Sequence, residues 1–349
     1  MSTVETTNTA TVAATERGAA GKLSPMIWGI HISRCVYAAA ELGIADLLAD
    51  GPQSSQELAE ATGMHEPSLY RVLRVLAALG VFEEHHGRQF SLTVVGERLR
   101  TGAELGMRSW AVFLEALGGV RPFAHILETL RTGTPGREVE FKEQLFDSLS
   151  RDLEAAKIFD HAMAERTAAY APSVADTCDF SEVRTIVDVG GGNGTLLVEI
   201  LRRHRHLSGL LFEIAKVGAR ADAVRDATDL ADRCQVLAGD FFEQVPSADC
   251  YLLANVLHDW DDQRSIEILR NCRKAMRGAG RVLIIERLIP EDGADPVPTL
   301  LSDINMLVLT GGRERTNREY GALLAAAGLR PAGVTPVAFP YGVIEGAAA

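Results

Sequence analysis

The chain has 349 residues, 47% of them hydrophobic, which is long enough for two domains with sizeable cores. Its formal net charge of -12 argues against nucleic acid or an anionic membrane as the main partner and favours a neutral or cationic small molecule. The five cysteines are scattered and form no C-x-x-C pair, so neither a disulfide framework nor a zinc site is expected. No apolar run approaches the length of a membrane span, and we expect a cytoplasmic protein.

The N-terminal part of the chain predicts a tail followed by a compact helical module. Residues 1–22 are rich in Ala and Thr, lack the apolar core of a signal peptide, and are expected to be a disordered tail. Residues 23–105 contain a short helix at 55–63 that ends in glycine, a longer helix at 68–79, and a β-hairpin around Gly87. This order is typical of a winged helix. The longer helix offers only Arg71 and Arg74 to a phosphate backbone, so a DNA-binding regulator is the weaker interpretation.

The middle of the chain, residues 106–180, is expected to be a helical linker that also contributes to a substrate pocket. Its aromatic and methionine side chains favour core packing, but the same side chains near a pocket would hold a flat apolar substrate. The side chains weighed in this way are Trp110, Phe113, Phe123, Phe141, Phe146, Phe159 and Met163, of which Trp110, Phe113, Phe159 and Met163 are expected at the pocket.

The C-terminal part, residues 181–349, alternates strands with helices. Strands are expected at 185–189, 210–213, 234–238, 250–254 and 281–286. This order predicts an α/β fold with a Rossmann-like, mostly parallel sheet and helices on both faces. Ligands of such a sheet bind at the carboxyl ends of its strands, so polar residues that follow each strand are candidate site residues.

A glycine-rich loop follows the first of these strands. The segment Asp188-Val-Gly-Gly-Gly-Asn-Gly194 reads D-x-G-x-G-x-G, and Thr195 stands where the dinucleotide fingerprint needs its third glycine. The loop lets the backbone approach a ligand, and the next helix points its free N–H groups at the same place. The negative Asp188 suits a cofactor with a positive end, such as the amino group and sulfonium of S-adenosylmethionine. A turn without ligand and a nicotinamide enzyme are the alternatives.

Two further strand ends extend this cofactor site. Glu213 ends the second strand, where nucleotide folds place the carboxylate that accepts the ribose hydroxyls. After the third strand, Asp240 could accept from an adenine amino group and Phe241 could pack on the ring, although a simple turn is the alternative. The expected cofactor-binding residues are Asp188, Gly190, Gly192, Glu213, Gly239, Asp240, Phe241, Phe242 and Asn255.

His258, after the fourth strand, is the candidate general base. Its ordinary pKa lies nearest neutrality among side chains, so it can take a proton from a hydroxyl as the oxygen attacks. Packing or capping is the alternative role. Asp261 and Asp262 are interpreted first as caps of a helix at 263–276. A metal site made of these two residues and Asp259 lacks the spacing of a known loop, so we expect no metal.

Two glutamates further along could orient His258. Glu286 follows the fifth strand, and Glu314 precedes a helix at 317–327. A carboxylate beside an imidazole fixes its tautomer and stabilises the imidazolium. Salt bridges to nearby arginines are the alternative for each glutamate.

These motifs together resemble the class I, S-adenosylmethionine-dependent small-molecule O-methyltransferases of the plant-caffeate and bacterial natural-product type. The resemblance covers roughly residues 23–345 and rests on the following segments: Asp188-Val-Gly-Gly-Gly-Asn-Gly194, Phe212-Glu213, Gly239-Asp240-Phe241-Phe242, Leu257-His258-Asp259-Trp260, Glu286-Arg-Leu-Ile-Pro290 and Arg313-Glu314-Arg-Thr316. It implies that the N-terminal module pairs two subunits into a homodimer.

The resemblance also implies a reaction and site roles. The glycines from Gly190 would hold the methionine part, and His258, flanked by Glu286 and Glu314, would be the base for in-line methyl transfer to a phenolic or enolic hydroxyl of an aromatic natural product. The residues expected at the acceptor are Trp110, Phe113, Phe159, Met163, Asp259, Asn305 and Met306. A hydroxylase or decarboxylase that keeps S-adenosylmethionine is the alternative within the family.

Three positions depart from the family pattern. The segment Glu213-Ile-Ala-Lys216 replaces the more common aspartate followed by Leu-Pro, Ala254 replaces a lysine of plant relatives, and Asp160 replaces a common asparagine. These changes concern the contacts of the cofactor rather than the base.

Overall fold

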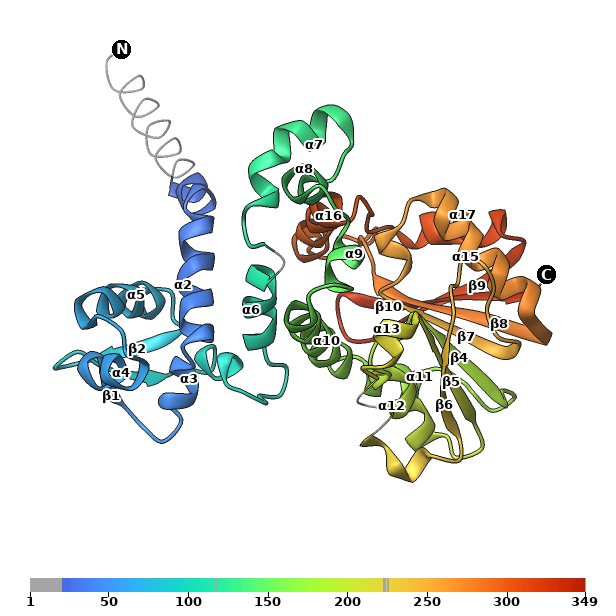
Figure 1. Cartoon of the computed structure of the whole chain (residues 1–349), viewed down its shortest axis with the longest axis horizontal. Helices are drawn as coiled ribbons and strands as arrows, with labels where there is room; N and C mark the ends of the chain where they lie inside the picture. The colour runs from blue at the N-terminus through green and yellow to red at the C-terminus, as the bar shows by residue number, and fades with distance from the viewer. Residues whose placement is uncertain (1–20, 117, 222–223, 225, 349) are drawn as a thin grey trace, which may run out of the picture. The chain divides into compact units, whose positions relative to one another are not determined.

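The computed structural model describes residues 21–116, 118–221, 224 and 226–348. The chain divides into two compact units, the first ending at Glu115 and the second beginning at Ala116 (Figure 1). The expected disordered tail lies outside the described residues except for residues 21–22, which are helical. The expected boundaries near residues 105 and 180 fall inside the two units and stay predictions.

The first unit is a helical module with a small sheet. Its elements are α2 (Gly29–Glu41), α3 (Ile44–Leu47), β1 (Gln53–Ser54), α4 (Ser55–Thr62), α5 (Glu66–Ala78), β2 (Phe82–His85), β3 (Gln89–Leu92), η1 (Gly96–Leu99) and α6 (Arg108–Ala116). Ser54 and Glu57 form a capping box at the start of α4, and Gly63 ends that helix in a left-handed conformation. Helix α5 begins two residues earlier than expected because Pro67 fits its first turn. The hairpin β2–β3 is confirmed.

The second unit opens with a helical segment, as the sequence predicts. It contains η2 (Pro122–His125), α7 (Ile126–Thr132), α8 (Gly136–Phe141), α9 (Leu145–Leu149), α10 (Leu153–Ala168) and α11 (Ala171–Thr177). Asp152 caps α10 by accepting from the N–H groups of Glu154 and Ala155. Five of these six elements are seven residues or shorter, so tertiary packing rather than helix propensity holds them.

A seven-stranded sheet forms the body of the second unit, in the order β6-β5-β4-β7-β8-β10-β9. Its strands are β4 (Thr185–Val189), β5 (Ser208–Glu213), β6 (Cys234–Ala238), β7 (Ala248–Ala254), β8 (Met276–Arg287), β9 (Leu329–Pro336) and β10 (Tyr341–Ala348). The first five pair in parallel, which confirms the expected mostly parallel sheet. The sequence did not predict β9 and β10, which add an antiparallel edge. Pro331 and Gly333 interrupt the strand pattern of β9, and such residues are tolerated there because β9 is an edge strand.

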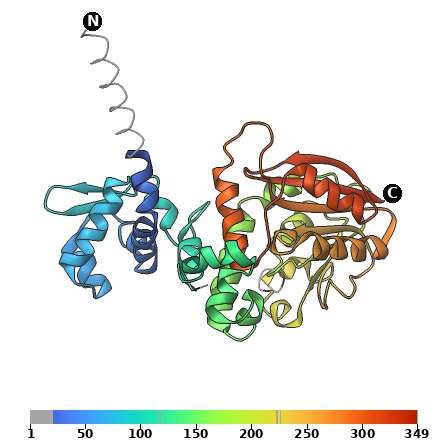
Figure 2. The ribbon, with the colours of Figure 1, turned by 90° about the horizontal axis from the view of Figure 1, so that it is seen from above.

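Helices cover both faces of this sheet (Figures 1 and 2). Alternate residues of β4 enter different cores: Ile186 packs with α11 and α12, whereas Val187 packs with α15 and α17. The remaining elements are α12 (Thr195–Arg203), α13 (Ala215–Gly218), η3 (Thr228–Leu230), η4 (Leu257–Asp259), α15 (Asp262–Ala275), α16 (Val297–Leu309) and α17 (Asn317–Ala326). Because β4 to β8 are parallel, their carboxyl ends meet at one edge and bring the predicted site residues together. Among the described residues, no helix is both long and apolar enough to cross a bilayer.

Candidate active site

The glycine loop between β4 and α12 turns sharply at three positions. Gly190, Gly192 and Gly194 adopt φ values of +69°, +59° and +88°, which L side chains rarely adopt. The N–H of Gly190 donates to the carbonyl of Phe212 at 2.8 Å, so the loop is tied to the end of β5. A Cβ atom on Gly191 would lie 2.4 Å from the carboxylate of Asp188. The loop therefore packs directly on Asp188.

Asp188 is a fully buried carboxylate at the start of this loop. Neither of its oxygens has a hydrogen-bond partner among the residues that the structure describes. Burial, with a smaller contribution from the nearby charge of Glu213, raises the pKa of Asp188 to about 7. A buried acid without a donor fits a positively charged ligand group, as the sequence analysis expects for the amino group of S-adenosylmethionine.

Glu213 lies beside the glycine loop at the end of β5. Its carboxylate accepts from the N–H of Gly192 at 3.2 Å and from the N–H of Ile214 at 2.8 Å. Burial raises its pKa, and these two hydrogen bonds oppose the rise. The carboxylate is thus held at the place where the sequence predicts a ribose contact.

The predicted adenine side is a turn with two aromatic rings. Asp240 accepts from the N–H of Phe242 at 2.8 Å, as a simple turn does. The ring of Phe241 would lie 3.5 Å from a Cβ atom on Gly190, so it borders the glycine loop, and its contact with adenine stays a prediction. A Cβ atom on Gly239 would lie 2.4 Å from the ring of Phe212, so only glycine fits there.

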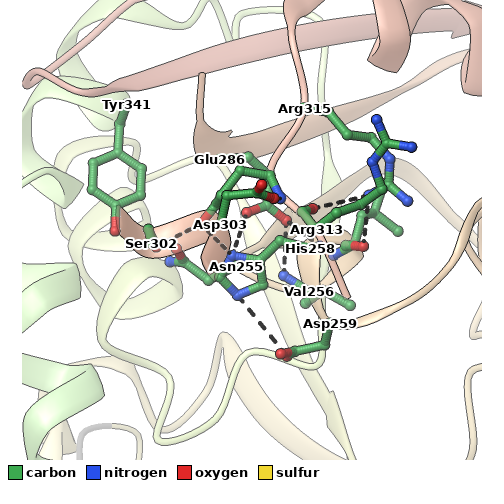
Figure 3. Close-up of polar contacts among 12 residues, drawn as sticks. Asn255, Val256, His258, Asp259, Glu286, Ser302, Asp303, Arg313, Arg315 and Tyr341 are labelled. Atoms are coloured by element: carbon green, nitrogen blue, oxygen red, sulfur yellow. Dashed lines mark hydrogen bonds and ion pairs between the residues drawn. The ribbon is translucent and has the colours of Figure 1, made fainter. Parts of the chain in front are cut away.

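His258 lies on the short helical turn η4 and is 5% exposed. Its Nδ1 atom is 3.4 Å from Oε2 of Glu286 and 3.3 Å from Oε1 of Glu314, whereas its Nε2 atom is 3.9 Å from Oδ2 of Asp259 (Figure 3). The structure therefore brings the three predicted catalytic residues together, with both glutamates on the same side of the imidazole ring.

The two glutamates are held by different groups. Oε1 of Glu286 accepts from three consecutive backbone N–H groups, those of Val256, Leu257 and His258, at 3.0, 2.9 and 3.3 Å. This leaves Oε2 to face the imidazole. Oε1 of Glu314 accepts from the hydroxyl of Ser302 at 2.7 Å.

Ser302 and its neighbour Asp303 are site residues that the sequence analysis missed. Asp303 accepts from the backbone N–H of Glu314 at 2.8 Å, so both residues position that glutamate. Both lie on α16, whose sequence is otherwise largely apolar. A polar pair within an apolar helix was the signal that could have found them.

The electrostatics of this cluster differ from the expectation for an isolated histidine. Burial alone lowers the pKa of His258, but the carboxylates of Glu286, Glu314 and Asp259 outweigh burial and raise the pKa to about 10. Burial raises the pKa of Asp259 to about 6 and that of Glu286 to about 7. Burial also disfavours the charged form of Glu314, but the charge of His258 and the hydrogen bonds lower the pKa of that glutamate. The three carboxylates thus favour the imidazolium form of His258.

A second polar network was also missed by the sequence analysis. Arg166 on α10 donates to the hydroxyl of Tyr341 and, at 3.2 Å, to the side-chain oxygen of Asn255. Asn255 adopts a φ of +54° and donates to the hydroxyl of Tyr170 at 2.8 Å. Residues 166 and 341 are far apart in the chain, so no local sequence pattern predicts this contact.

A cavity opens beside Asp259 and Trp260. Its lining residues are Pro135, Glu138, Gln144, Leu145, Phe146, Asp259, Trp260, Leu309 and Thr310. The rings of Phe146 and Trp260 are nearly parallel, with centroids 6.5 Å apart. Of the residues predicted at the acceptor, Asp259 lines this cavity, and Phe159 meets the ring of Phe146 edge to face at 6.3 Å.

The other predicted acceptor residues are placed as follows. Met163 lies on α10 and is half-buried, and Asn305 and Met306 lie on α16, where Met306 is buried. Trp110 and Phe113 lie on α6 of the first unit, with ring centroids 5.1 Å apart. The roles of these five residues stay predictions.

Two of the three acidic residues considered for a metal site are engaged elsewhere. Asp261 caps α15 by accepting from the N–H of Arg264 at 2.8 Å, which confirms its expected role. Asp262 is not a cap as expected but the first residue of α15, where its carboxylate pairs with Arg315. A different trio, His258, Glu286 and Glu314, places possible ligand atoms within 4.8 Å of one another.

Two family models match the chain. The model of the O-methyltransferase domain matches residues 123–330, and the model of the O-methyltransferase dimerisation domain matches residues 26–102. The chain is 41% identical over 324 residues to the phenazine O-methyltransferase PhzM of Lysobacter antibioticus, covering 93% of this chain and 94% of that protein. It is 38% identical over 322 residues to the aclacinomycin 10-hydroxylase RdmB of Streptomyces purpurascens, covering 88% and 85%.

Solved structures share the fold over nearly the whole chain. The mitomycin 7-O-methyltransferase MmcR has a TM-score of 0.89 and 36% identity, covering 97% of this chain and 100% of that one. NcsB1, an O-methyltransferase from neocarzinostatin biosynthesis, has a TM-score of 0.79 and 35% identity, covering 91% and 96%. NcsB1 was crystallised with S-adenosylmethionine and 2-hydroxy-5-methyl naphthoic acid.

Proposed function

The chain belongs to the S-adenosylmethionine-dependent O-methyltransferases, and from that premise we propose that His258 is the general base for methylation of a phenolic or enolic hydroxyl on an aromatic natural product. The observation that carries this proposal is the orientation of His258. Two glutamates face its Nδ1 atom, whereas its Nε2 atom is 3.9 Å from the carboxylate of Asp259, a residue that lines the cavity.

We propose that the glycine loop and its two acids hold the cofactor. Asp188 would meet the amino group of the methionine part, and Glu213 would meet the ribose hydroxyls. When bound, the cofactor supplies a sulfonium methyl group that an oxygen nucleophile takes in line, leaving a neutral thioether. The chain fixes the reacting groups in place and removes the hydroxyl proton.

The proton passes to Nε2 of His258 in this mechanism. Glu286 and Glu314 keep the other proton on Nδ1 and stabilise the imidazolium. Because these carboxylates raise the pKa of His258 to about 10, it matches the ordinary pKa of a phenol, about 10. Transfer between groups of matched pKa is nearly neutral in free energy. Because the pKa of His258 is raised, its Nε2 atom must lose a proton before it can act as a base, so kcat/KM should rise with pH.

The residues around the cavity suit a flat aromatic acceptor that is neutral or cationic. Phe146 and Trp260 offer aromatic rings for packing. The carboxylates of Glu138 and Asp259 would repel a negatively charged group on the acceptor. This agrees with the acidic balance of the whole chain.

We also propose that the reaction uses no metal ion. His258 at neutral pH carries the positive charge that balances the buried acids, and one oxygen of Glu286 is taken by three N–H groups. Dialysis against a chelator should therefore leave turnover unchanged. Loss of activity that added metal restores would assign the His258, Glu286 and Glu314 trio to a metal site instead.

The test of the base is His258→Gln, assayed by mass spectrometry with a panel of hydroxyphenazines. We expect turnover to fall about 10²- to 10⁴-fold, the range for a lost general base, while calorimetry shows unchanged affinity for S-adenosylmethionine. In the unmodified enzyme, log kcat/KM should rise with pH from 7 toward the pKa of about 10. Equal loss of turnover and cofactor affinity would refute the assignment.

Hydroxylation is the second candidate, because RdmB, a named hydroxylase, is 38% identical to this chain. The same assay separates the two reactions, since methylation adds one CH₂ to the mass of the acceptor and hydroxylation adds one oxygen atom. A product with added oxygen, or no methylated product from any probe while the cofactor binds, would favour the hydroxylase.

A further inference from the structure

We propose that Arg315 is a positioning residue for this reaction, which fixes the direction of His258 by holding the backbone carbonyls of the turn that carries it. The proposal rests on the proposed role of His258. It concerns a residue that does not itself line the cavity beside Asp259.

Arg315 is fully buried and directs its guanidinium at this turn. The guanidinium donates to the carbonyl of Leu257 at 3.0 Å and to that of Trp260 at 2.9 Å, one residue before and two residues after His258. It also pairs with the carboxylate of Asp262 at 2.8 Å. Arg315 lies beside the turn in Figure 3, on the side away from Tyr341.

Neighbouring segments hold the other backbone polar groups of the same turn. Glu286 accepts from the N–H groups of residues 256–258, and the N–H of Arg313 donates to the carbonyl of His258 at 2.8 Å. A Cβ atom on Gly312 would lie 1.9 Å from that carbonyl oxygen, so the segment before Arg315 lies directly against the turn. The carboxylate of Glu286 thus holds backbone N–H groups of the turn, and the guanidinium of Arg315 holds two of its backbone carbonyls.

The imidazole itself is held more weakly than its backbone. Its Nδ1 contacts with Glu286 and Glu314 measure 3.4 and 3.3 Å, longer than the usual charge-assisted hydrogen bond of about 2.7 to 2.9 Å. The direction of Nε2 therefore depends on the backbone of the turn. Burying a guanidinium is costly, and Asp262, whose side chain is 56% exposed, balances it only in part. An apolar residue at position 315 would fill the same space without the desolvation cost of a guanidinium. This favours a role for Arg315 in holding the geometry of the turn.

The first test is Arg315→Lys, which keeps the charge and loses the planar fork that reaches both carbonyls. We expect kcat to fall roughly 10- to 100-fold, the scale of an ångström misplacement, with KM for the acceptor and affinity for the cofactor unchanged. A shifted turn moves His258 away from Glu286 and Glu314, so the pKa of His258 should fall toward its ordinary value.

The groups that set this titration come from several elements. Glu286 lies on β8, Glu314 follows α16, and Asp259 is on the turn itself. Arg166 on α10 acts on two of these acids, Glu314 and Asp259. The variant leaves all of them in place. We would measure the titration of His258 by ¹⁵N NMR in the protein without acceptor, so that this readout does not depend on turnover.

Arg233→Lys is the matched control. Arg233 also donates to backbone carbonyls, those of Leu201, His204 and Leu207, but at the end of the sheet where the strands begin. We expect it to lower Tm without changing kcat or the titration of His258. If Arg315→Lys lowers Tm alone, like the control, Arg315 is a packing residue and the proposal is wrong.

Asp262→Asn is the second variant, used where Arg315→Lys does not fold. Asp262 is the ionic partner of Arg315, and its side chain is largely exposed, so the substitution should be tolerated. A smaller loss of kcat with the same downward shift of the His258 titration supports the proposal, and an unchanged enzyme contradicts it. If His258→Gln is fully active, the proposed function fails on its own, whereas the NMR shift still reports on Arg315.

Discussion

At the scale of single residues, Asp188 shows how burial makes a side chain sensitive to its ligand. It has no donor among the described residues, and its pKa is raised to about 7 chiefly by burial. In a free protein below pH 7 the carboxyl group is therefore mainly protonated. A cation bound beside it favours the ionised form, so binding and proton release are linked.

This linkage predicts a pH dependence of cofactor binding. Affinity for S-adenosylmethionine should decrease as pH falls below about 7, and at pH 6 binding should release close to one proton. Calorimetry in buffers of different ionisation enthalpy measures the release. Asp188→Asn should bind more weakly and lose the linked proton. A release that persists in the variant would mean that another group titrates.

At the scale of an element, the glycines of the β4–α12 connection meet two different structural requirements. Gly192 and Gly194 need positive φ, whereas Gly191 needs the absence of a side chain because Asp188 and Leu211 lie within 2.6 Å of where a Cβ atom would be. The strand, the loop and the buried acid form one packed unit. A change at Gly191 must therefore disturb the acid as well as the backbone.

Gly191→Ala should separate this packing effect from ordinary glycine effects. We expect a loss of about 1 to 3 kcal/mol in the free energy of unfolding, as for overpacked cores. Affinity for S-adenosylmethionine should also fall by roughly tenfold or more, about 1.4 kcal/mol. Denaturant unfolding and calorimetry measure the two quantities. Gly63→Ala, at a helix end with positive φ and open space, is the control and should change stability alone. Unchanged affinity in Gly191→Ala would contradict the packing of the loop on Asp188.

At the scale of the whole molecule, the first unit carries exposed apolar side chains at the start of its helical region. Leu23, Met26, Ile27, Trp28 and Ile30 are all exposed. Clusters of this kind mark interaction surfaces in soluble proteins. The match to an O-methyltransferase dimerisation domain begins at residue 26, within this cluster.

We therefore expect a homodimer in which this cluster is covered. Light scattering should give twice 37.6 kDa for the full chain. The double variant Met26→Glu and Ile27→Glu should shift the mass toward one chain, because buried unpaired charges oppose association. Arg71→Glu on α5 is the control and should leave the mass unchanged. A monomer in the unmodified protein would overturn this expectation.

The sequence by itself determined the features that depend on local pattern. The glycine loop with Asp188, the parallel strands and the Asp261 cap could be predicted because strand periodicity, turn chemistry and capping are written in neighbouring residues. His258 and Glu286 could be placed together because both lie at the ends of parallel strands, and such strands bring their carboxyl ends to one edge.

Only the tertiary structure decided what depends on distant residues packing together. The roles of Ser302, Arg166 and Arg315, and the edge strand β9, come from contacts across many residues. The raised pKa of His258 has the same origin, because three carboxylates brought together from separate segments outweigh the effect of burial. The sequence thus identifies the side chains of this site. Their charge states and orientations depend on burial and on distances between them, which only the folded chain determines.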